Sequence, residues 1–288
     1  MTASGAAKVA GIVGWPVAQT FSPRLHGYWL NELGIDGLYV PLPVRSEDLS
    51  SVIRGVMNAG FKGVNVTIPH KEAAFALCHD CDLAAKIAGA ANLLVFHDNG
   101  RIEGRNTDAA GFAGSLREHL GNDALHGKAI VVLGAGGAAR AVAMALHDLG
   151  AGEIRIVNRS RMRAEQLSAQ LSPHIAPKIR IFEHVDWAKA AKGAVLAVNA
   201  TSTGMKGASS LDVPLDVLPK DAWICDIVYN PLETDLLKRA KKAGFRTIDG
   251  LGMLMHQGVP AFAAFYGGEA NVTPALRQYL EEALRGGK

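Results

Sequence analysis

The stretch from Ala129 to Arg140 constrains the fold more than any other part of this sequence. An apolar strand pattern, 129–133, runs directly into Gly134-Ala-Gly-Gly-Ala-Ala-Arg140, which opens a helical pattern over 138–149. The spacing is G-x-G-x-x-A, whose glycines permit a tight turn and let backbone amides approach a pyrophosphate at a helix N-terminus. A bare tight turn is the alternative, but the flanking strand and helix favour a dinucleotide site. The residues expected to hold the cofactor here are Gly134, Ala135, Gly136, Gly137 and Ala138.

The end of the next strand pattern, 154–157, indicates which dinucleotide binds. A unit that binds NAD usually carries an acidic residue about 20 positions after the first glycine. Here Asn158 stands 158 − 134 = 24 positions on, and Arg159, Ser160 and Arg163 follow it in place of a carboxylate. Guanidinium groups pair with a 2′-phosphate, so the sequence predicts NADP, and Asn158 joins the expected cofactor residues. The alternative is an ordinary charged helix start, although arginines there oppose the helix dipole.

Strand and helix patterns alternate along almost the whole chain. The nearly continuous apolar strands with intervening helices predict an α/β fold with parallel sheets covered on both faces. A short polar loop over 121–128 separates two such series, and we place a domain boundary there. The expected strands are 9–13, 38–41, 64–67, 93–96, 129–133, 154–157, 179–182, 195–199, 223–227 and 246–248, and the expected helices include 23–33, 49–59, 109–120, 138–149, 164–171 and 234–243.

Composition and charge narrow the class of partner. With 288 residues, 49% hydrophobic and 20% charged, the chain is expected to be globular. A net charge of +3 with scattered basic residues does not indicate nucleic acid binding, but it favours small anionic ligands. No apolar run approaches the roughly 18 residues of a membrane span, and the N-terminus lacks a leader pattern. We therefore expect a cytoplasmic protein with no membrane partner.

Cysteine usage gives no disulfide framework, because the chain has only three cysteines. Cys78 and Cys81 form a C-x-x-C with His79 between them, and Cys225 is remote. A structural zinc site would need two more ligands at matching spacing, and a redox motif is expected at a strand-to-helix turn. We therefore expect packed thiols on a helix, and no metal.

A lysine and an aspartate each follow a predicted strand. Lys71 comes just after the strand 64–67 and a proline, and Asp108 closes Gly104-Arg-Asn-Thr-Asp108 after a short strand-like run. A lysine held at a strand end, near a carboxylate, suits acid/base catalysis. Alone, each has an ordinary alternative, a solvated helix start for Lys71 and a helix cap for Asp108. Together they suggest a catalytic dyad.

A set of ordered motifs resembles the shikimate dehydrogenase family. The motifs run from near residue 11 to beyond residue 257 in the order expected for that family. They are Gly14–His26, Asn65–Lys71, Gly89–Asn92, Gly104–Asp108, Asn199–Met205, Asp226–Thr234 and Gly250–Gln257. The resemblance implies a substrate-binding catalytic domain over 1–120, a Rossmann NADP-binding domain over 121–249, and C-terminal helices over 250–288 that return to pack on the first domain. It also allows a homodimer.

The resemblance further implies a role for each matching residue. The family reduces 3-dehydroshikimate to shikimate with NADPH, in the biosynthesis of aromatic amino acids. Lys71 is implied as the acid/base group, with Asp108 holding it in place. Thr20, Ser22 and Tyr229 are implied to bind the substrate carboxylate, and the ring hydroxyls would be read by Asn65, Thr67, Asn92, Gln257 and also Asp108. The cofactor residues implied in addition are Thr201, Met205, Ile227 and Gly250.

Three departures from the family pattern leave the substrate open. Thr20 stands where the family usually has serine, Leu93 where threonine is usual, and Phe265 where tryptophan is common. The alternatives are therefore a paralogue acting on quinate or a related cyclic hydroxy acid, and a non-catalytic NADP-binding regulator. The methylene-tetrahydrofolate dehydrogenases and glutamyl-tRNA reductases share the two-domain plan, but they are not expected to carry this motif set.

Overall fold

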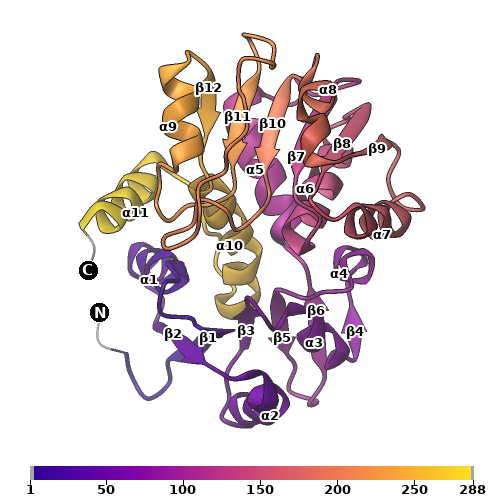
Figure 1. The fold of residues 1–288 in the computed structure, drawn as a ribbon. Coiled ribbons are helices and arrows are strands. Elements are labelled where there is room, and N and C mark those ends of the chain that lie inside the picture. Colours follow the sequence, from indigo (N-terminus) through magenta and orange to yellow (C-terminus); the bar gives the residue numbers. More distant parts are fainter. Residues whose placement is uncertain (1–2, 287–288) are drawn as a thin grey trace. The chain divides into compact units, whose positions relative to one another are not determined.

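The computed structural model describes residues 3–286, and the chain divides into two compact units. Unit 1 comprises residues 1–107 and 255–282, and unit 2 comprises residues 108–254 and 283–288. Each unit is built on a six-stranded sheet, labelled in Figure 1. Within residues 3–286, no helix has the length and apolar character needed to cross a membrane.

The sheet of unit 1 is mixed. Its strand order is β2-β1-β3-β5-β6-β4. The strands are β1 (Lys8–Gly14), β2 (Gly37–Pro43), β3 (Gly63–Val66), β4 (Asp80–Cys81), β5 (Leu93–Phe96) and β6 (Ile102–Arg105). β1 runs parallel to β2 and β3, whereas β5 is antiparallel to both β3 and β6. The expectation of a parallel sheet was therefore wrong for this unit, because a short apolar run such as β5 is buried equally well in either direction.

Helices and an aliphatic core complete unit 1. The helices are α1 (Ser22–Glu32), α2 (Leu49–Asn58), α3 (Lys71–Ala76), α4 (Leu83–Ala88) and most of α11 (Pro274–Gly286), with a short 3₁₀ helix at Ser46–Asp48. Pro23 lies in the first turn of α1, where a missing N–H costs nothing. Asp82 caps α4 by accepting from the Ala85 N–H at 2.6 Å. Ile53 and Val64 are fully buried in the core between α2 and the sheet.

The sheet of unit 2 is parallel throughout and has the order β12-β11-β10-β7-β8-β9. Its strands are β7 (Ala129–Leu133), β8 (Glu153–Val157), β9 (Lys178–Phe182), β10 (Leu196–Asn199), β11 (Trp223–Asp226) and β12 (Arg246–Ile248). Counted from β7, this is the order 3-2-1-4-5-6 of a Rossmann sheet. The direction of winding reverses between β7 and β10, and ligands of such sheets bind at that point.

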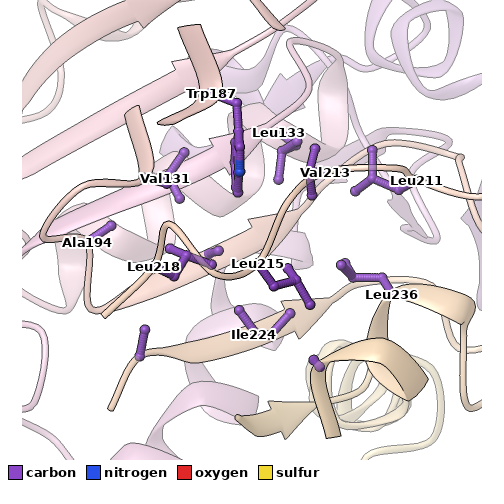
Figure 2. Packing of buried hydrophobic residues seen from close by; sticks show 14 of the residues in the cluster. Val131, Leu133, Trp187, Ala194, Leu211, Val213, Leu215, Leu218, Ile224 and Leu236 are labelled. Carbon is purple, nitrogen blue, oxygen red and sulfur yellow. The ribbon is translucent and has the colours of Figure 1, made fainter. Parts of the chain in front are cut away.

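The helices of unit 2 cover its sheet. They are α5 (Asp108–Leu120), α6 (Gly137–Asp148), α7 (Arg161–Leu171), α8 (Trp187–Ala191) and α9 (Asp235–Lys242), with a short 3₁₀ helix at His184–Asp186, and α10 (Leu251–Tyr266) begins in unit 2 and continues in unit 1. Figure 2 shows Trp187 beside Val131, Leu133 and Val213 in the core under α8 and α9. The alternate strand residues Ile130 and Val132 are also buried, so both faces of β7 are covered.

The C-x-x-C pair does not lie on a helix as the sequence predicted. α3 ends at Ala76, Cys78 lies in the turn that follows, and Cys81 belongs to β4. β4 pairs in parallel with β6, which places Cys81 opposite Gly104. The helical pattern ends early because the chain must turn here to reach the sheet edge. All three cysteines are free thiols.

Candidate functional site

Polar side chains from three separate segments of unit 1 form one hydrogen-bonded group. The Asn92 side-chain N–H₂ donates to Thr107 Oγ1 at 3.0 Å and to Gln257 Oε1 at 3.3 Å. Asn92 Oδ1 accepts from the Thr107 backbone N–H at 2.9 Å. Thr107 Oγ1 also donates to the Gln257 carbonyl at 3.1 Å. The structure thus brings together two predicted substrate residues, Asn92 and Gln257, through a threonine that the sequence analysis did not single out.

The antiparallel pairing of β5 and β6 explains why Asn92 meets Thr107. Asn92 precedes β5, Thr107 follows β6, and Leu93 pairs with Arg105. The Asn92 N–H donates to the Arg105 carbonyl at 3.0 Å, which extends the pairing to the end of the hairpin. Both side chains are buried, Asn92 to 3% and Thr107 to 5% exposure, so their mutual hydrogen bonds fix their orientation.

Tyr39 links three further predicted substrate residues of unit 1, which are Thr20, Ser22 and Asn65. Its hydroxyl donates to Asn65 Oδ1 at 2.7 Å and is hydrogen-bonded to Ser22. Ser22 Oγ in turn accepts from Thr20 Oγ1 at 3.2 Å. Burial, followed by the nearby Tyr266, raises the pKa of Tyr39 well above its ordinary value, so the hydroxyl stays protonated. The sequence analysis missed Tyr39, although a tyrosine in an apolar strand pattern indicates a buried hydroxyl that needs a partner.

The two asparagines connect these groups. The Asn65 side-chain N–H₂ donates to the Asn92 carbonyl at 3.1 Å, so the Thr20–Ser22–Tyr39–Asn65 chain of contacts reaches the Asn92 group. The Thr67 N–H donates to the Val13 carbonyl at 2.9 Å, and Thr67 follows β3 directly. Hydroxyl and amide groups of this kind recognise carboxylates and sugar-like hydroxyls without a cationic side chain.

Lys71 is fixed beside this group by its backbone. It is the first residue of α3, and its carbonyl accepts from the Ala91 N–H at 2.9 Å, one residue before Asn92. His70 Nε2 is hydrogen-bonded to the Val44 carbonyl at 2.7 Å and anchors the turn before the helix. Asp108 follows Thr107, begins α5 and is 6% exposed. Because Lys71 belongs to unit 1 and Asp108 opens unit 2, their pairing as a dyad stays a prediction.

The glycine-rich loop of unit 2 has the form that a pyrophosphate requires. Gly134 has a φ of +115°, and a Cβ there would lie 3.0 Å from the Ala200 carbonyl oxygen. The turn therefore runs close to the end of β10 and needs glycine. Cβ atoms built on Gly136 and Gly137 meet nothing within 4 Å among the described residues. No described atom crowds the positions where side chains would project at the start of α6, which suits the close approach of a dinucleotide phosphate.

The arginines after β8 differ in their partners. Arg161 pairs with Glu165 at 2.8 Å. Arg159 and Arg163 are exposed, and within residues 3–286 neither of them forms a side-chain ion pair. Ser160 Oγ accepts from the Arg163 N–H at 3.4 Å as the cap of α7, and its own O–H remains a donor. Asn158 Nδ2 donates to the Ser160 carbonyl at 2.9 Å, which holds the turn. This arrangement fits an anion such as a 2′-phosphate.

A buried polar network supports the loops that follow β10 and β11. Asp226 Oδ1 accepts from Asn199 Nδ2 and from the Val228 N–H, both at 3.0 Å, and Asp226 Oδ2 accepts from Thr234 Oγ1 at 2.7 Å. Burial raises the pKa of the Asp226 carboxyl above its ordinary value. The sequence analysis named these three residues within two family motifs but gave them no role, because nothing in the chain order indicates that they meet.

Three of the remaining predicted cofactor residues, Thr201, Met205 and Ile227, lie on these loops, and the fourth, Gly250, follows β12. Thr201 Oγ1 donates to Asn199 Oδ1 at 2.7 Å, and the Ile227 N–H donates to the Asn199 carbonyl at 3.1 Å. A Cβ on Gly250 would overlap the Ile227 carbonyl, so that position needs glycine. Met205 is partly exposed, at 37%. Tyr229, predicted to bind the substrate carboxylate, is also on the loop after β11, in unit 2.

Within residues 3–286, no group of three or more His, Cys, Asp or Glu side chains is arranged to hold a metal ion. The chemistry that the described groups offer is hydroxyl recognition in unit 1 and dinucleotide binding in unit 2.

Comparison with known proteins gives a consistent result. Residues 12–94 match the shikimate dehydrogenase substrate binding domain, and residues 116–206 match shikimate / quinate 5-dehydrogenase. Shikimate dehydrogenase (NADP(+)) of Paramagnetospirillum magneticum is 49% identical over 280 residues, which cover 96% of this chain and 99% of that protein.

Two solved structures are similar over nearly the whole chain. Shikimate 5-dehydrogenase of Thermus thermophilus, in complex with NADP(H) and shikimate, is 36% identical with a TM-score of 0.83, covering 98% of this chain and 100% of that one. Quinate dehydrogenase from Corynebacterium glutamicum, in complex with NAD, is 30% identical with a TM-score of 0.88, covering 96% of this chain and 99% of the other. The chain belongs to the shikimate dehydrogenase family.

Proposed function

We propose that this protein catalyses the reversible, NADP-dependent reduction of 3-dehydroshikimate to shikimate. The observation that carries the proposal is the continuous set of hydroxyl and amide contacts from Thr20 through Tyr39 and Asn65 to Asn92, in a chain 49% identical to a curated shikimate dehydrogenase (NADP(+)). A site that pairs with substrate hydroxyls discriminates strongly against analogues that lack them, by ~10⁴-fold or more.

The proposed roles follow from the chemistry of each group. Thr20, Ser22 and Tyr229 donate to the substrate carboxylate. The ring hydroxyls are bound by Asn65, Thr67, Asn92, Asp108 and Gln257. Bound NADPH supplies the hydride. Lys71 donates a proton to the oxygen of the reduced carbonyl and takes one back in the reverse direction, and Asp108 orients the Lys71 ammonium.

The cofactor roles also follow from the geometry of unit 2. The amides of Gly136 and Gly137 bind the pyrophosphate, and Arg159 and Arg163 bind the 2′-phosphate with Ser160 as a further donor. In this assignment residues 1–120 bind substrate, 121–249 bind NADP, and the C-terminal helices of 250–288 pack on the substrate domain. A cytoplasmic location and a homodimer complete the proposal, and light scattering after size-exclusion chromatography tests the latter.

Quinate is the second candidate substrate. Leu93 replaces a hydroxyl residue beside Asn92, and Thr20 adds a methyl group to the carboxylate end. Both changes alter the part of the site that distinguishes closely related rings. The likeness to the quinate dehydrogenase of Corynebacterium glutamicum, with a TM-score of 0.88, favours testing this substrate first among the alternatives.

Initial rates on shikimate and quinate, each measured with NADP and with NAD, test the proposed function. We expect the highest kcat/KM for shikimate with NADP. A higher kcat/KM for quinate than for shikimate would identify quinate as the substrate, and the reaction class would stay the same. No turnover of either acid, together with tight NADP binding, would instead support a non-catalytic NADP-binding regulator.

A further inference from the structure

The thiols of Cys78 and Cys81 meet over one residue of β6. The two sulfurs are within hydrogen-bonding range of each other. A Cβ placed on Gly104 would overlap Cys78 Sγ and lie 3.1 Å from Cys81 Sγ, so both sulfurs lie against the backbone of that glycine. The parallel pairing of Cys81 with Gly104 fixes this position from the strand side. The turn after α3 fixes it from the other side, because Cys78 Sγ donates to the Ala74 carbonyl at 3.2 Å.

β4, the strand that carries Cys81, borders a surface hollow. An open hollow of about 350 Å³ is lined by Cys81 with Asp80 and Asp82, and by His97, Asn99 and Arg101 from the turn between β5 and β6. Arg101 pairs with Asp80, and Arg105 pairs with Glu103 at 2.6 Å, so much of the charge at its rim is balanced. Cys78 and Cys81 are both half-buried, whereas the third cysteine, Cys225, is only 1% exposed.

The surroundings of Cys78 set the order in which the two half-buried thiols react. Burial, then the adjacent Cys81 sulfur, raises the pKa of Cys78 to about 12, so Cys78 keeps its proton. The thiolate is the attacking species in thiol–disulfide exchange, so Cys81 is the first to react.

We propose that Cys81 and Cys78 form a reversible dithiol–disulfide site that reacts with low-molecular-weight disulfides. The Cys81 thiolate attacks one sulfur of the small disulfide, forms a mixed disulfide and releases one small thiolate. Cys78 then loses its proton to solvent and attacks Cys81 Sγ, which releases the second small thiolate and leaves a Cys78–Cys81 disulfide. Two protein thiols are oxidised and one small disulfide is reduced to two thiols. The mixed disulfide at Cys81 also removes the negative charge of the Cys81 thiolate. That charge is one of the causes that raise the pKa of Cys78.

The test uses 2-hydroxyethyl disulfide, a small neutral probe, mixed with 2-mercaptoethanol over a graded series of ratios. The folded full-length protein is incubated, quenched with acid, and analysed by intact mass and peptide mapping. We expect the wild-type protein to lose two hydrogens and to carry a Cys78–Cys81 disulfide with Cys225 still a thiol. Addition of excess 2-mercaptoethanol should restore three thiols.

Single variants then test the order of attack. Cys78→Ser should accumulate a mixed disulfide at Cys81, because the second step is blocked. Cys81→Ser should leave Cys78 unmodified over the same time. Cys78 in that variant should react at least tenfold more slowly than Cys81 does in Cys78→Ser. Cys225→Ala is the matched control and should form the disulfide as the wild type does.

Two results would overturn the proposal. One is a folded wild-type protein that keeps three free thiols across the whole series. The other is equal modification of Cys78 and Cys81 in the single variants, which would remove the assigned order. The wild-type measurement needs no substitution, so a variant that fails to fold does not leave the question open.

Discussion

The imidazole ring of His26 lies flat on the phenol ring of Tyr39, with ring centroids 4.0 Å apart and 5° between the ring planes. Trp29 meets the same imidazole edge-on at 5.8 Å, and Phe262 lies 5.9 Å away. His26 is 1% exposed, and its Nδ1 has no hydrogen-bond partner among residues 3–286. Burial lowers the pKa of His26 from 6.5 to about 3. A neutral, stacked ring therefore supports the tyrosine that connects Ser22 with Asn65.

Replacement of His26 by phenylalanine is expected to protect the fold against acid. The folded state binds a proton on His26 only near pH 3, whereas the unfolded chain binds one below pH 6.5. Wild-type stability from this group is complete above pH 6.5 and falls as the pH drops toward 3, by about 1.4 kcal/mol per pH unit. His26→Phe removes this slope and keeps an aromatic stack. Urea unfolding at a series of pH values measures the difference.

The exposed His174 provides the control for this prediction. His174→Gln should leave the acid slope of the wild type unchanged. A His26→Phe protein that loses stability with falling pH as steeply as the wild type would contradict a buried neutral histidine.

Removal of the Tyr39 hydroxyl should weaken substrate binding selectively. Tyr39→Phe keeps the ring on His26 but breaks the link between Ser22 and Asn65. A hydrogen bond of this kind contributes about 0.5 to 1.5 kcal/mol, so KM for shikimate should rise roughly 2- to 12-fold while KM for NADP stays constant. Steady-state kinetics with each substrate varied in turn measures both. Equal increases in the two KM values would indicate a general loss of structure.

Loss of the Lys71 amine should reduce kcat far more than NADP affinity. General acid/base groups contribute about 10²- to 10⁴-fold, and Lys71→Ala should lower kcat by that order. Lys62→Ala, which removes an exposed lysine of the same unit, is the control and should retain wild-type rates. If Lys71→Ala keeps near wild-type kcat on its best substrate, Lys71 has no part in the proton transfer.

The exposed Arg159 and Arg163 should determine cofactor choice. Each charge-assisted contact with a 2′-phosphate contributes roughly 1.5 to 3 kcal/mol, so Arg159→Ala with Arg163→Ala should weaken NADP binding by about a hundredfold or more. NAD binding should barely change. Arg161→Ala is a matched control on the same turn, because Arg161 already pairs with Glu165. Calorimetric titration measures all three proteins, and unchanged NADP affinity in the double variant would remove both arginines from the phosphate site.

Asp226 gives a stability effect of the opposite sign from His26. Its pKa is raised by burial, so the folded state binds its proton more tightly than the unfolded state does. Wild-type stability from this group is highest below the ordinary carboxyl pKa of 3.8 and falls as the pH rises through the raised value. Asp226→Asn lacks this slope, so its unfolding free energy relative to the wild type should increase with pH, by about 1.4 kcal/mol per unit in that window.

The exposed Asp216 is the control for this slope. Asp216→Asn should follow the pH dependence of the wild type. A constant difference between Asp226→Asn and wild type across the same pH range would show that Asp226 ionises equally in both states.

The Rossmann unit was more predictable from the sequence than the other unit. Its buried parallel strands appear as apolar runs, and the predicted bounds of β7 and β12 are those observed. In unit 1 the direction of β5 was wrong, because an apolar run of four residues contains no information on its partner. The helix expected around Cys78 and Cys81 was also wrong, since the turn depends on pairing with β6.

The sequence indicated which residues belong to the site, but it did not indicate which of them are in contact. Asn92 and Gln257 are 165 positions apart, yet they are hydrogen-bonded to each other and both are hydrogen-bonded to Thr107. Tyr39 and Asp226 lie within apolar strand patterns, where a polar side chain is conspicuous but its partner is unknown. The roles of the individual residues stay predictions until the variants are measured.

The turn of the β5–β6 hairpin and the strand β6 should tolerate insertions differently. The pairing of Leu93 with Arg105 sets the spacing of Asn92 and Thr107, whereas the turn over 97–101 lies at the other end of the hairpin. An insertion in that turn leaves the strand register intact, while one inside β6 would move every following side chain to the opposite face. The turn is therefore the point at which to attach a tag or a fluorophore, and a probe there would lie at the rim of the hollow that contains Cys81.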